Sequence, residues 1–275
     1  TNYDMYGEFG CCLGTDPTID DPEVNDLKVA ILPLPGGEFY HFGTSHEIVS
    51  SMVDIQNIVN NQREIMHHSL KPHPSMFTQN SEVEIKITEH NQNLWIENSC
   101  VSAQWTIAHE NIITGVPRNQ CKIELHPGQC VDIVPIGDES YAIRPYGFND
   151  KFRGDITDGV TEYLGEPFTR WAEERGVDAA AIEGKDDLQS ARIFPVVDNI
   201  NDAGLVLRWM LNEPYQQGGR VVWNEAQRLS ADEISAQANL RRLAAQGKPC
   251  AELVVPLPQL RPQRVLPGRP RRCRP

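Results

Sequence analysis

The stretch of residues 36–48, GGEFYHFGTSHEI, constrains the fold more than any other part of the chain. Its paired glycines permit a turn, and the aromatic run at residues 39–42 is typical of a strand. Thr44 and Glu47 have the spacing of a capping box, in which each side chain binds a backbone amide at the start of a helix. The stretch therefore predicts a strand that brings His41 to a helix N-terminus, where unpaired backbone amides can bind an anion.

Apolar patterns on both sides extend this unit. Residues 27–34, LKVAILPL, predict a buried strand. With residues 39–42, this strand has the character of the last piece of an α/β sheet whose other strands precede the chain. After the turn, apolar residues at steps of three and four predict an amphipathic helix over residues 45–66. Pro72 and Pro74 then end the region.

The pattern changes between residues 76 and 148, where short β-type runs alternate with Asn, Gly, Ser and Pro. Many short strands without intervening helices are typical of a β-solenoid or of a small sandwich. No strict hexapeptide repeat is visible, so the pattern alone leaves both architectures open. The predicted strands lie at residues 83–87, 94–97, 105–108, 112–113, 122–125, 131–134 and 141–144.

Helical patterns return after a polar loop at residues 149–165. Ser230 and Glu233 have the spacing of a second capping box. We therefore predict a helical unit at residues 166–246, separate from the β-rich unit at residues 76–148. The predicted helices cover residues 168–175, 187–192, 201–212 and 230–246.

The end of the chain, residues 247–275, has a different composition, with recurrent proline and six arginines against the single acid Glu252. Proline removes backbone donors that helices and sheets need, so we predict an irregular, disordered tail. Two origins remain open. The tail is either a native basic segment or sequence that does not belong to the native protein, such as a frameshifted end.

The formal net charge of -13 argues against a nucleic-acid-binding protein, which would need a basic face. No apolar run approaches the length of a membrane span, and the N-terminus lacks the basic and apolar regions of a signal peptide. The chain begins with Thr1 rather than Met. We therefore expect a fragment of a larger protein that neither crosses a membrane nor binds nucleic acid.

Cysteine usage predicts free thiols. The count is odd, and no C-x-x-C pair or regular Cys/His spacing occurs, which disfavours a zinc site or a disulfide framework. Free thiols are typical of the reducing cytoplasm, so we predict a cytoplasmic location. The seven cysteines lie at positions 11, 12, 100, 121, 130, 250 and 273.

Several blocks resemble one enzyme family. The segment Phe-Tyr-His-Phe-Gly-Thr-Ser at residues 39–45 is similar to a segment of the bifunctional L-fucokinase/fucose-1-phosphate guanylyltransferases, where it opens the same helix. The resemblance covers roughly residues 1–246 and does not extend to the tail. Further matching blocks are NLWIENS (93–99), NIITGVP (111–117), RPYG (144–147), FP (194–195), GLVLRWML (204–211) and SADEISA (230–236).

The resemblance implies a mixed α/β chain with four parts. Residues 1–72 would be the C-terminal part of an α/β nucleotidyltransferase domain, and residues 73–150 a left-handed β-helix-like solenoid. Residues 151–246 would form a helical linker toward a missing kinase domain, followed by the Pro/Arg-rich tail at residues 247–275.

The implied chemistry comprises two reactions. ATP phosphorylates L-fucose, and the resulting fucose 1-phosphate then attacks the α-phosphate of GTP, giving GDP-L-fucose and pyrophosphate. Mg²⁺ would neutralise the phosphate charge. The implied ligands are therefore GTP and fucose 1-phosphate, and contacts through the β-rich region could form a homo-oligomer.

The resemblance also indicates site residues. Nucleotidyltransferases place an Mg²⁺-binding Asp where this chain has His41, which is either a metal ligand or a donor to phosphate or a sugar hydroxyl; a backbone-bonded structural His is the alternative. Phe39 corresponds to an aromatic residue that lines the sugar site, although a core position is the favoured alternative. Thr44 and His46 could contact the ligand, His46 replacing an Arg usual in the family. Glu8 could bind fucose hydroxyls or simply be a solvated acid.

No Gly-rich phosphate-binding loop occurs in the sequence. We therefore expect the chain alone to be inactive. Two alternatives remain open, a β-solenoid sugar acyltransferase and a non-enzymatic assembly module. The acyltransferase would need a catalytic histidine in the coils, and His109 and His126 are the candidates.

Overall fold

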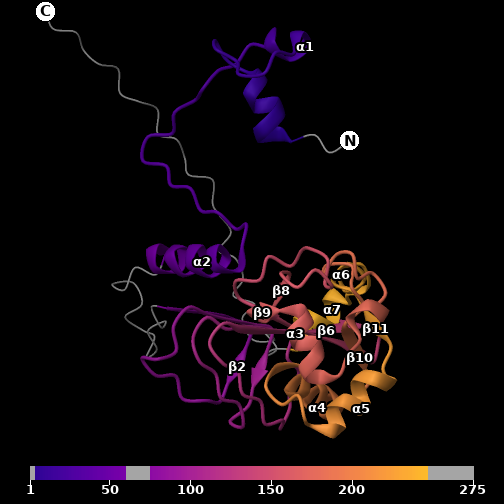
Figure 1. Ribbon diagram of the computed structural model, residues 1–275. Helices are drawn as coiled ribbons and strands as arrows, with labels where there is room; N and C mark the ends of the chain where they lie inside the picture. Colours follow the sequence, from indigo (N-terminus) through magenta and orange to yellow (C-terminus); the bar gives the residue numbers. More distant parts are fainter. Residues whose placement is uncertain (1–3, 60–74, 247–275) are drawn as a thin grey trace, which may run out of the picture. The chain divides into compact units, whose positions relative to one another are not determined.

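The computed structural model describes residues 4–59 and 75–246 (Figure 1). Contacts divide the chain into two compact units, residues 1–40 and residues 41–275. The predicted tail at residues 247–275 and the predicted helical residues 60–66 lie outside the described residues. Within the described residues, no helix is both long enough and apolar enough to cross a membrane.

The first unit consists of short helical turns capped by aspartates. Asp4 accepts hydrogen bonds from two amides of η1 (Met5–Phe9), which η2 (Gly10–Cys12) follows, and Asp21 does the same for α1 (Pro22–Asn25). Short acidic side chains at such positions satisfy amides that a helix leaves unpaired.

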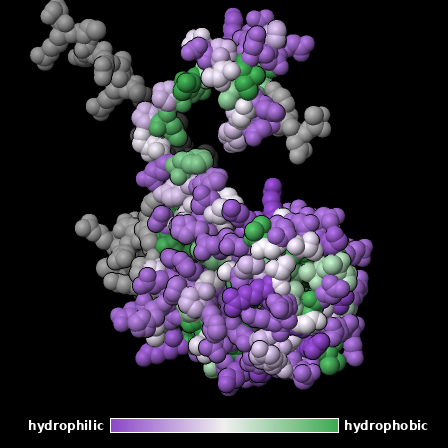
Figure 2. Space-filling view, in the orientation of Figure 1, coloured by the Kyte–Doolittle hydropathy of each residue, from purple (hydrophilic) through white to green (hydrophobic). Residues whose placement is uncertain are grey.

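The predicted strands at residues 27–34 and 39–42 are wrong, because both segments are irregular in the structure. A strand forms only when its backbone pairs with a neighbour, and no described residue supplies one. Apolar side chains consequently remain exposed, as Figure 2 shows by its green atoms in this part of the chain. The most exposed are Ile31, Leu32, Leu34 and Phe39.

The second unit begins with helix α2 (Ser45–Val59), whose start agrees with the prediction. Its Val49 is buried against Ile112, Cys130 and Phe148 of the following β-rich region. These three residues lie on one face of the sheet described below, so α2 covers that face (Figure 1).

The sheet has seven strands in the order β1-β3-β5-β6-β7-β10-β11. The first four are parallel, and β7 then reverses direction in a hairpin with β6. β10 and β11 continue the antiparallel half. Their bounds are β1 Met76–Gln79, β3 Leu94–Glu97, β5 Ile112–Thr114, β6 Gln129–Ile136, β7 Ser140–Gly147, β10 Phe194–Val197 and β11 Arg228–Leu229.

The parallel half repeats at a nearly constant spacing. Met76 pairs with Leu94, 18 residues further along, and Ile113 pairs with Val131 at the same spacing. A smaller parallel ladder, β2 (Glu82–Val83) with β4 (Cys100–Val101), has this spacing too. Left-handed backbone recurs at matching corners, first at Asn80, Asn98 and Gly115, then at Asn93, Glu110 and Gly128. Each pass of the chain therefore follows nearly the same path as the one before.

The predicted strands are confirmed at residues 94–97, 112–113, 131–134 and 141–144. The predicted run at 83–87 shortens to β2, and β1 was not predicted. The predicted strands at 105–108 and 122–125 are wrong as strands, because these segments meet only in one bridge, between Thr106 and Glu124. They lie between the left-handed corners, and two backbone hydrogen bonds join them, from Thr106 to Ile123 and from Leu125 to Thr106, which is too few for a ladder.

Five α-helices, one short 3-10 helix and a second small ladder complete the described part of the second unit. Helices α3 (Phe168–Arg175) and α4 (Ile200–Leu211) confirm two predictions. The ladder joins β8 (Glu162–Tyr163) to β9 (Glu166–Pro167). Further elements are η3 (Ala179–Ala181), α5 (Gln217–Glu225), α6 (Ala231–Gln237) and α7 (Leu240–Gln246).

Two predicted helices differ from the structure. Residues 187–192 form turns, because their amides bond outside the segment, as Leu188 does to Gly154 and Arg192 to Glu183. The predicted helix at 230–246 is two helices, α6 and α7. Ala238, between them, is extended and forms a bridge with Ile136, which interrupts the helical hydrogen bonding.

One hydrophobic core joins the sheet to the helices and is continuous across residue 150. Aromatic rings form its centre, with Trp171 and Trp209 at a centroid distance of 6.1 Å and Trp209 and Trp223 at 5.4 Å. The domain boundaries predicted at residues 72, 150 and 246 stay predictions.

The capping box of α6 supports a prediction on pH. Ser230 and Glu233 form the predicted reciprocal bonds, and Arg192 donates to Glu233 as well. The hydrogen bond from Arg192 is the main cause that holds the pKa of Glu233 below its ordinary value of 4.5. A carboxylate whose pKa is lowered by folding stabilises the folded state at any pH above its ordinary pKa. This stabilisation is lost as the pH falls through the lower pKa of the folded state. We expect Glu233→Gln to lower the thermal midpoint near neutral pH, and the difference from wild type to shrink below pH 4.5. A difference independent of pH would contradict this role.

Candidate functional site

The N-terminus of α2 brings together three of the predicted site residues. The Glu47 amide donates to Thr44 Oγ1 at 3.2 Å, and the Thr44 hydroxyl donates to Glu47 Oε2 at 3.0 Å. The hydrogen bond from the backbone amide of the third helical residue to the Thr44 hydroxyl confirms the predicted cap. His46 lies in the first turn, with its ring at 6.1 Å from the ring of Phe148 in an edge-to-face arrangement.

His41 is held beside this cap. Its Nδ1 is 3.0 Å from Glu47 Oε1, and its carbonyl accepts a hydrogen bond from Ser51 Oγ at 2.7 Å. The hydrogen bond from His41 is the main cause that lowers the pKa of Glu47, so this carboxylate is ionised near neutral pH. The His41 side chain is 59% exposed. An oriented, solvent-accessible imidazole beside a carboxylate can bind polar ligand groups.

Glu8 and Phe39, the remaining predicted site residues, belong to the other unit. Glu8 Oε2 accepts a hydrogen bond from the Asp4 amide at 2.9 Å, which is a local contact in the first helical turn. Phe39 is 87% exposed, so its ring is accessible to a ligand and is not a core residue in this structure.

The sequence analysis did not identify a row of polar side chains on the face of the sheet that α2 covers. Strand pairing places Glu97 beside Thr114, Thr114 beside Asp132, and Asp132 beside Arg144. Each lies two residues along its strand from a residue of the cluster around Val49, and therefore points to the same face of the sheet. We call Glu97, Thr114, Asp132 and Arg144 the polar row.

Bonds within the polar row centre on Asp132, which is buried. It accepts from Thr114 Oγ1 at 2.5 Å and from Arg144 Nε at 3.0 Å, with a second bond from Arg144 Nη2. Glu97 accepts from the Trp95 indole at 3.1 Å. Three members of the row fall in separate blocks of the family resemblance, but no local motif links one block to the next.

The described residues do not suit Mg²⁺. Within residues 4–59 and 75–246 there is no group of three or more His, Cys, Asp or Glu side chains placed to hold a metal ion. His41 and Glu47 offer one nitrogen and one carboxylate, whereas Mg²⁺ prefers oxygen ligands in octahedral geometry. We therefore assign no metal-dependent step to these residues.

The histidines of the acyltransferase alternative lie in different surroundings. His109 lines a cavity of about 490 Å³ with Trp105 and Ile107, and its Nδ1 is 3.5 Å from Glu110 Oε2. His126 is not among the residues that line this cavity, and its Nε2 is 3.5 Å from Glu124 Oε1.

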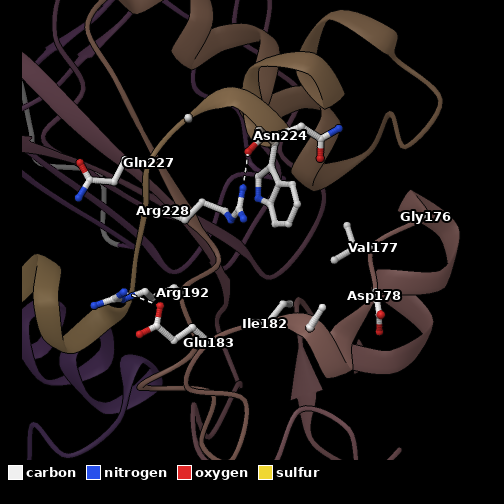
Figure 3. Close-up of a pocket in the computed structure, with 12 residues that line it drawn as sticks. Gly176, Val177, Asp178, Ile182, Glu183, Arg192, Asn224, Gln227 and Arg228 are labelled. Carbon is white, nitrogen blue, oxygen red and sulfur yellow. Dashed lines mark hydrogen bonds and ion pairs between the residues drawn. The ribbon is translucent and has the colours of Figure 1, made fainter.

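A further cavity, of about 500 Å³, lies between the turn after α3 and the segment from α5 to β11 (Figure 3). Its charged lining includes Arg192 and Arg228, and its indole wall is Trp223. No sequence motif marked this cavity, because its walls come from three separate segments.

Comparison with known proteins adds family evidence to this geometry. Residues 23–199 match the fucose pyrophosphorylase domain family. L-fucokinase/L-fucose-1-P guanylyltransferase of Bacteroides fragilis is 51% identical over 245 residues, which cover 89% of this chain and 26% of that protein. The chain thus spans about a quarter of the length of this curated relative. No solved structure matches the chain.

Proposed function

Because the chain belongs to the fucose pyrophosphorylase family, we propose that it is part of an enzyme that transfers a guanylyl group from GTP to fucose 1-phosphate. In this reaction a phosphate oxygen of fucose 1-phosphate attacks the α-phosphorus of GTP. The bond from that phosphorus to the bridging oxygen breaks, and pyrophosphate leaves. The observation that carries the proposal is the FYHFGTS segment, which lies within the matched region and positions His41 at the start of α2.

We propose that His41 binds a hydroxyl group of the sugar. Bare amides at a helix N-terminus favour an anion, but the Glu47 carboxylate lies 3.0 Å from His41 and would repel a phosphate there. A neutral hydroxyl meets no such repulsion. Glu8, Phe39, Thr44 and His46 remain proposed substrate contacts, and Mg²⁺ is proposed to arrive with the GTP phosphates.

We also propose that residues 73–150 are a β-helix-like solenoid. The 18-residue spacing of paired strands and the recurring left-handed corners support it, since a solenoid repeats one path in each coil. Residues 1–72 would complete the nucleotidyltransferase domain, and residues 151–246 would lead toward the kinase part. The fucokinase activity in the relative's name is proposed to reside outside this chain.

The test is an assay of GDP-fucose formed from GTP and fucose 1-phosphate with Mg²⁺, using this chain and a full-length enzyme that contains it. We expect product from the full-length enzyme and none from this chain. Turnover by the chain alone would refute the proposal that the GTP site lies in a part of the enzyme outside this chain. In a parallel thermal-shift screen, stabilisation by acetyl-CoA but not by GDP-fucose would favour the acyltransferase alternative.

Replacing His41 in the full-length enzyme tests its role. We expect His41→Ala to raise KM for fucose 1-phosphate about fivefold to tenfold, the cost of one lost hydrogen bond, while KM for GTP stays unchanged. His126→Ala is the matched control, because it removes an exposed histidine that also lies near a glutamate. Equal kinetics for the two variants would remove His41 from the sugar site.

A further inference from the structure

The cavity between the α3 turn and β11 is separate from every residue used in the proposed function. Figure 3 shows Val177 and Ile182 on one side and Arg228 on the other. Trp223 also lines the cavity. Its volume of about 500 Å³ is within the range of small-molecule sites. The chemistry of its walls decides what kind of molecule it would recognise.

Arg228 is the main recognition element. Its guanidinium carbon lies 4.3 Å from the centroid of the Trp223 ring, and its Nη1 donates to the Trp223 carbonyl at 2.9 Å. The indole is itself fixed, being buried and donating to the Ile193 carbonyl at 2.9 Å. The guanidinium plane is therefore held in place before any ligand arrives, which lowers the entropy cost of binding.

The charge of Arg228 has no acidic partner among the described residues. The other cavity arginine, Arg192, is neutralised by Glu183 at 2.5 Å and by Glu233 at 2.6 Å. Asp178 accepts from the Ala180 amide at 3.0 Å, so this carboxylate caps η3. Burial lowers the pKa of Arg228, which agrees with a cation that is partly removed from water and not compensated.

We propose that this cavity binds a small organic anion. Its carboxylate or phosphate oxygens accept hydrogen bonds from the remaining donors of Arg228, since a planar guanidinium matches paired oxyanion oxygens. The apolar body of the ligand lies against the half-buried side chains of Val177 and Ile182. A neutral analogue would leave the Arg228 charge unpaired and bind less well.

The experiment is an NMR titration of the whole chain that follows the Trp223 indole N–H signal. The probes are benzoate, phenyl phosphate and the neutral benzyl alcohol. We expect saturable shifts with at least one anion and none with benzyl alcohol at equal concentration. Saturation by benzoate alone assigns a carboxylate ligand, and saturation by phenyl phosphate alone assigns a phosphate. The absence of saturable shifts with both anions overturns the proposal.

Variants separate recognition from structure. Arg228→Lys keeps a cation over the indole but loses the planar pair of donors, so we expect affinity for the anion to fall about tenfold with the fold retained. Arg118→Gln is the control for net charge, because it removes an arginine that is 72% exposed and does not line this cavity. Unchanged affinity in Arg228→Lys, or an equal loss in Arg118→Gln, would overturn recognition by Arg228.

Discussion

Replacing Arg175 by methionine is expected to lower the free energy of unfolding by about 3–5 kcal/mol. The Arg175 side chain is 2% exposed and donates to three backbone carbonyls. Its Nε bonds Trp209 at 3.0 Å, its Nη2 bonds Leu211 at 2.8 Å, and its Nη1 bonds Trp171 at 3.2 Å. The first two are carbonyls at the end of α4, which a helix cannot pair internally.

Methionine retains an apolar stem but donates no hydrogen bonds, so the variant isolates the loss of the donors. Each carbonyl left buried and unpaired costs about 1–3 kcal/mol. The measurement is denaturant unfolding, with the slope checked for an unchanged two-state transition. Arg170→Met is the control on the same helix, because Arg170 is 67% exposed and its ion pairs should contribute less than about 1 kcal/mol. Equal losses in both variants would rule out this role for Arg175.

Local signals predicted the start of α2 and of α6 correctly. In both cases a hydroxyl at the N-cap and a glutamate three residues later are enough, because the cap bonds lie within one turn. The strands predicted at residues 27–34 and 39–42 show the limit of such signals. Apolar alternation favours a strand, but the strand itself depends on a partner that can be far along the chain.

Other differences arise from contacts between distant residues. The break between α6 and α7 depends on Ala238, which bridges to Ile136 more than 100 residues earlier. Helical periodicity on both sides of Ala238 contains no sign of this contact. The repeat of about 18 residues was also hidden in the sequence, because part of it pairs only through a two-residue ladder or a single bridge.

The candidate site also combines contacts between residues close in sequence with contacts between distant ones. The capping pattern of Thr44 and Glu47 correctly placed the start of the helix, and His41 contacts Glu47 there because only six residues separate them. The polar row gathers residues from four strands, and only the register of the sheet brings them into contact. The cavity at Arg228 likewise depends on three segments that meet through tertiary packing.

Asp132→Asn is the second large effect, with an expected loss of about 2–4 kcal/mol in the free energy of unfolding. The substitution keeps the shape but removes the charge that compensates Arg144. The Asp132 side chain is 5% exposed and that of Arg144 is 27% exposed, so water screens the remaining cation only in part. This partial exposure is the reason to expect less than the full cost of an unpaired, fully buried charge.

A double-mutant cycle with Arg144→Met separates the ion pair from general damage to the sheet. Because removing both charges leaves no uncompensated ion, we expect the double variant to be more stable than Asp132→Asn alone. The control pair is Glu82 and Arg118, which are 2.5 Å apart but have side chains 37% and 72% exposed. Its coupling energy should stay below about 1 kcal/mol. Equal coupling energies for the buried and the exposed pair would contradict the conclusion that burial makes the ion pair of the polar row important for stability.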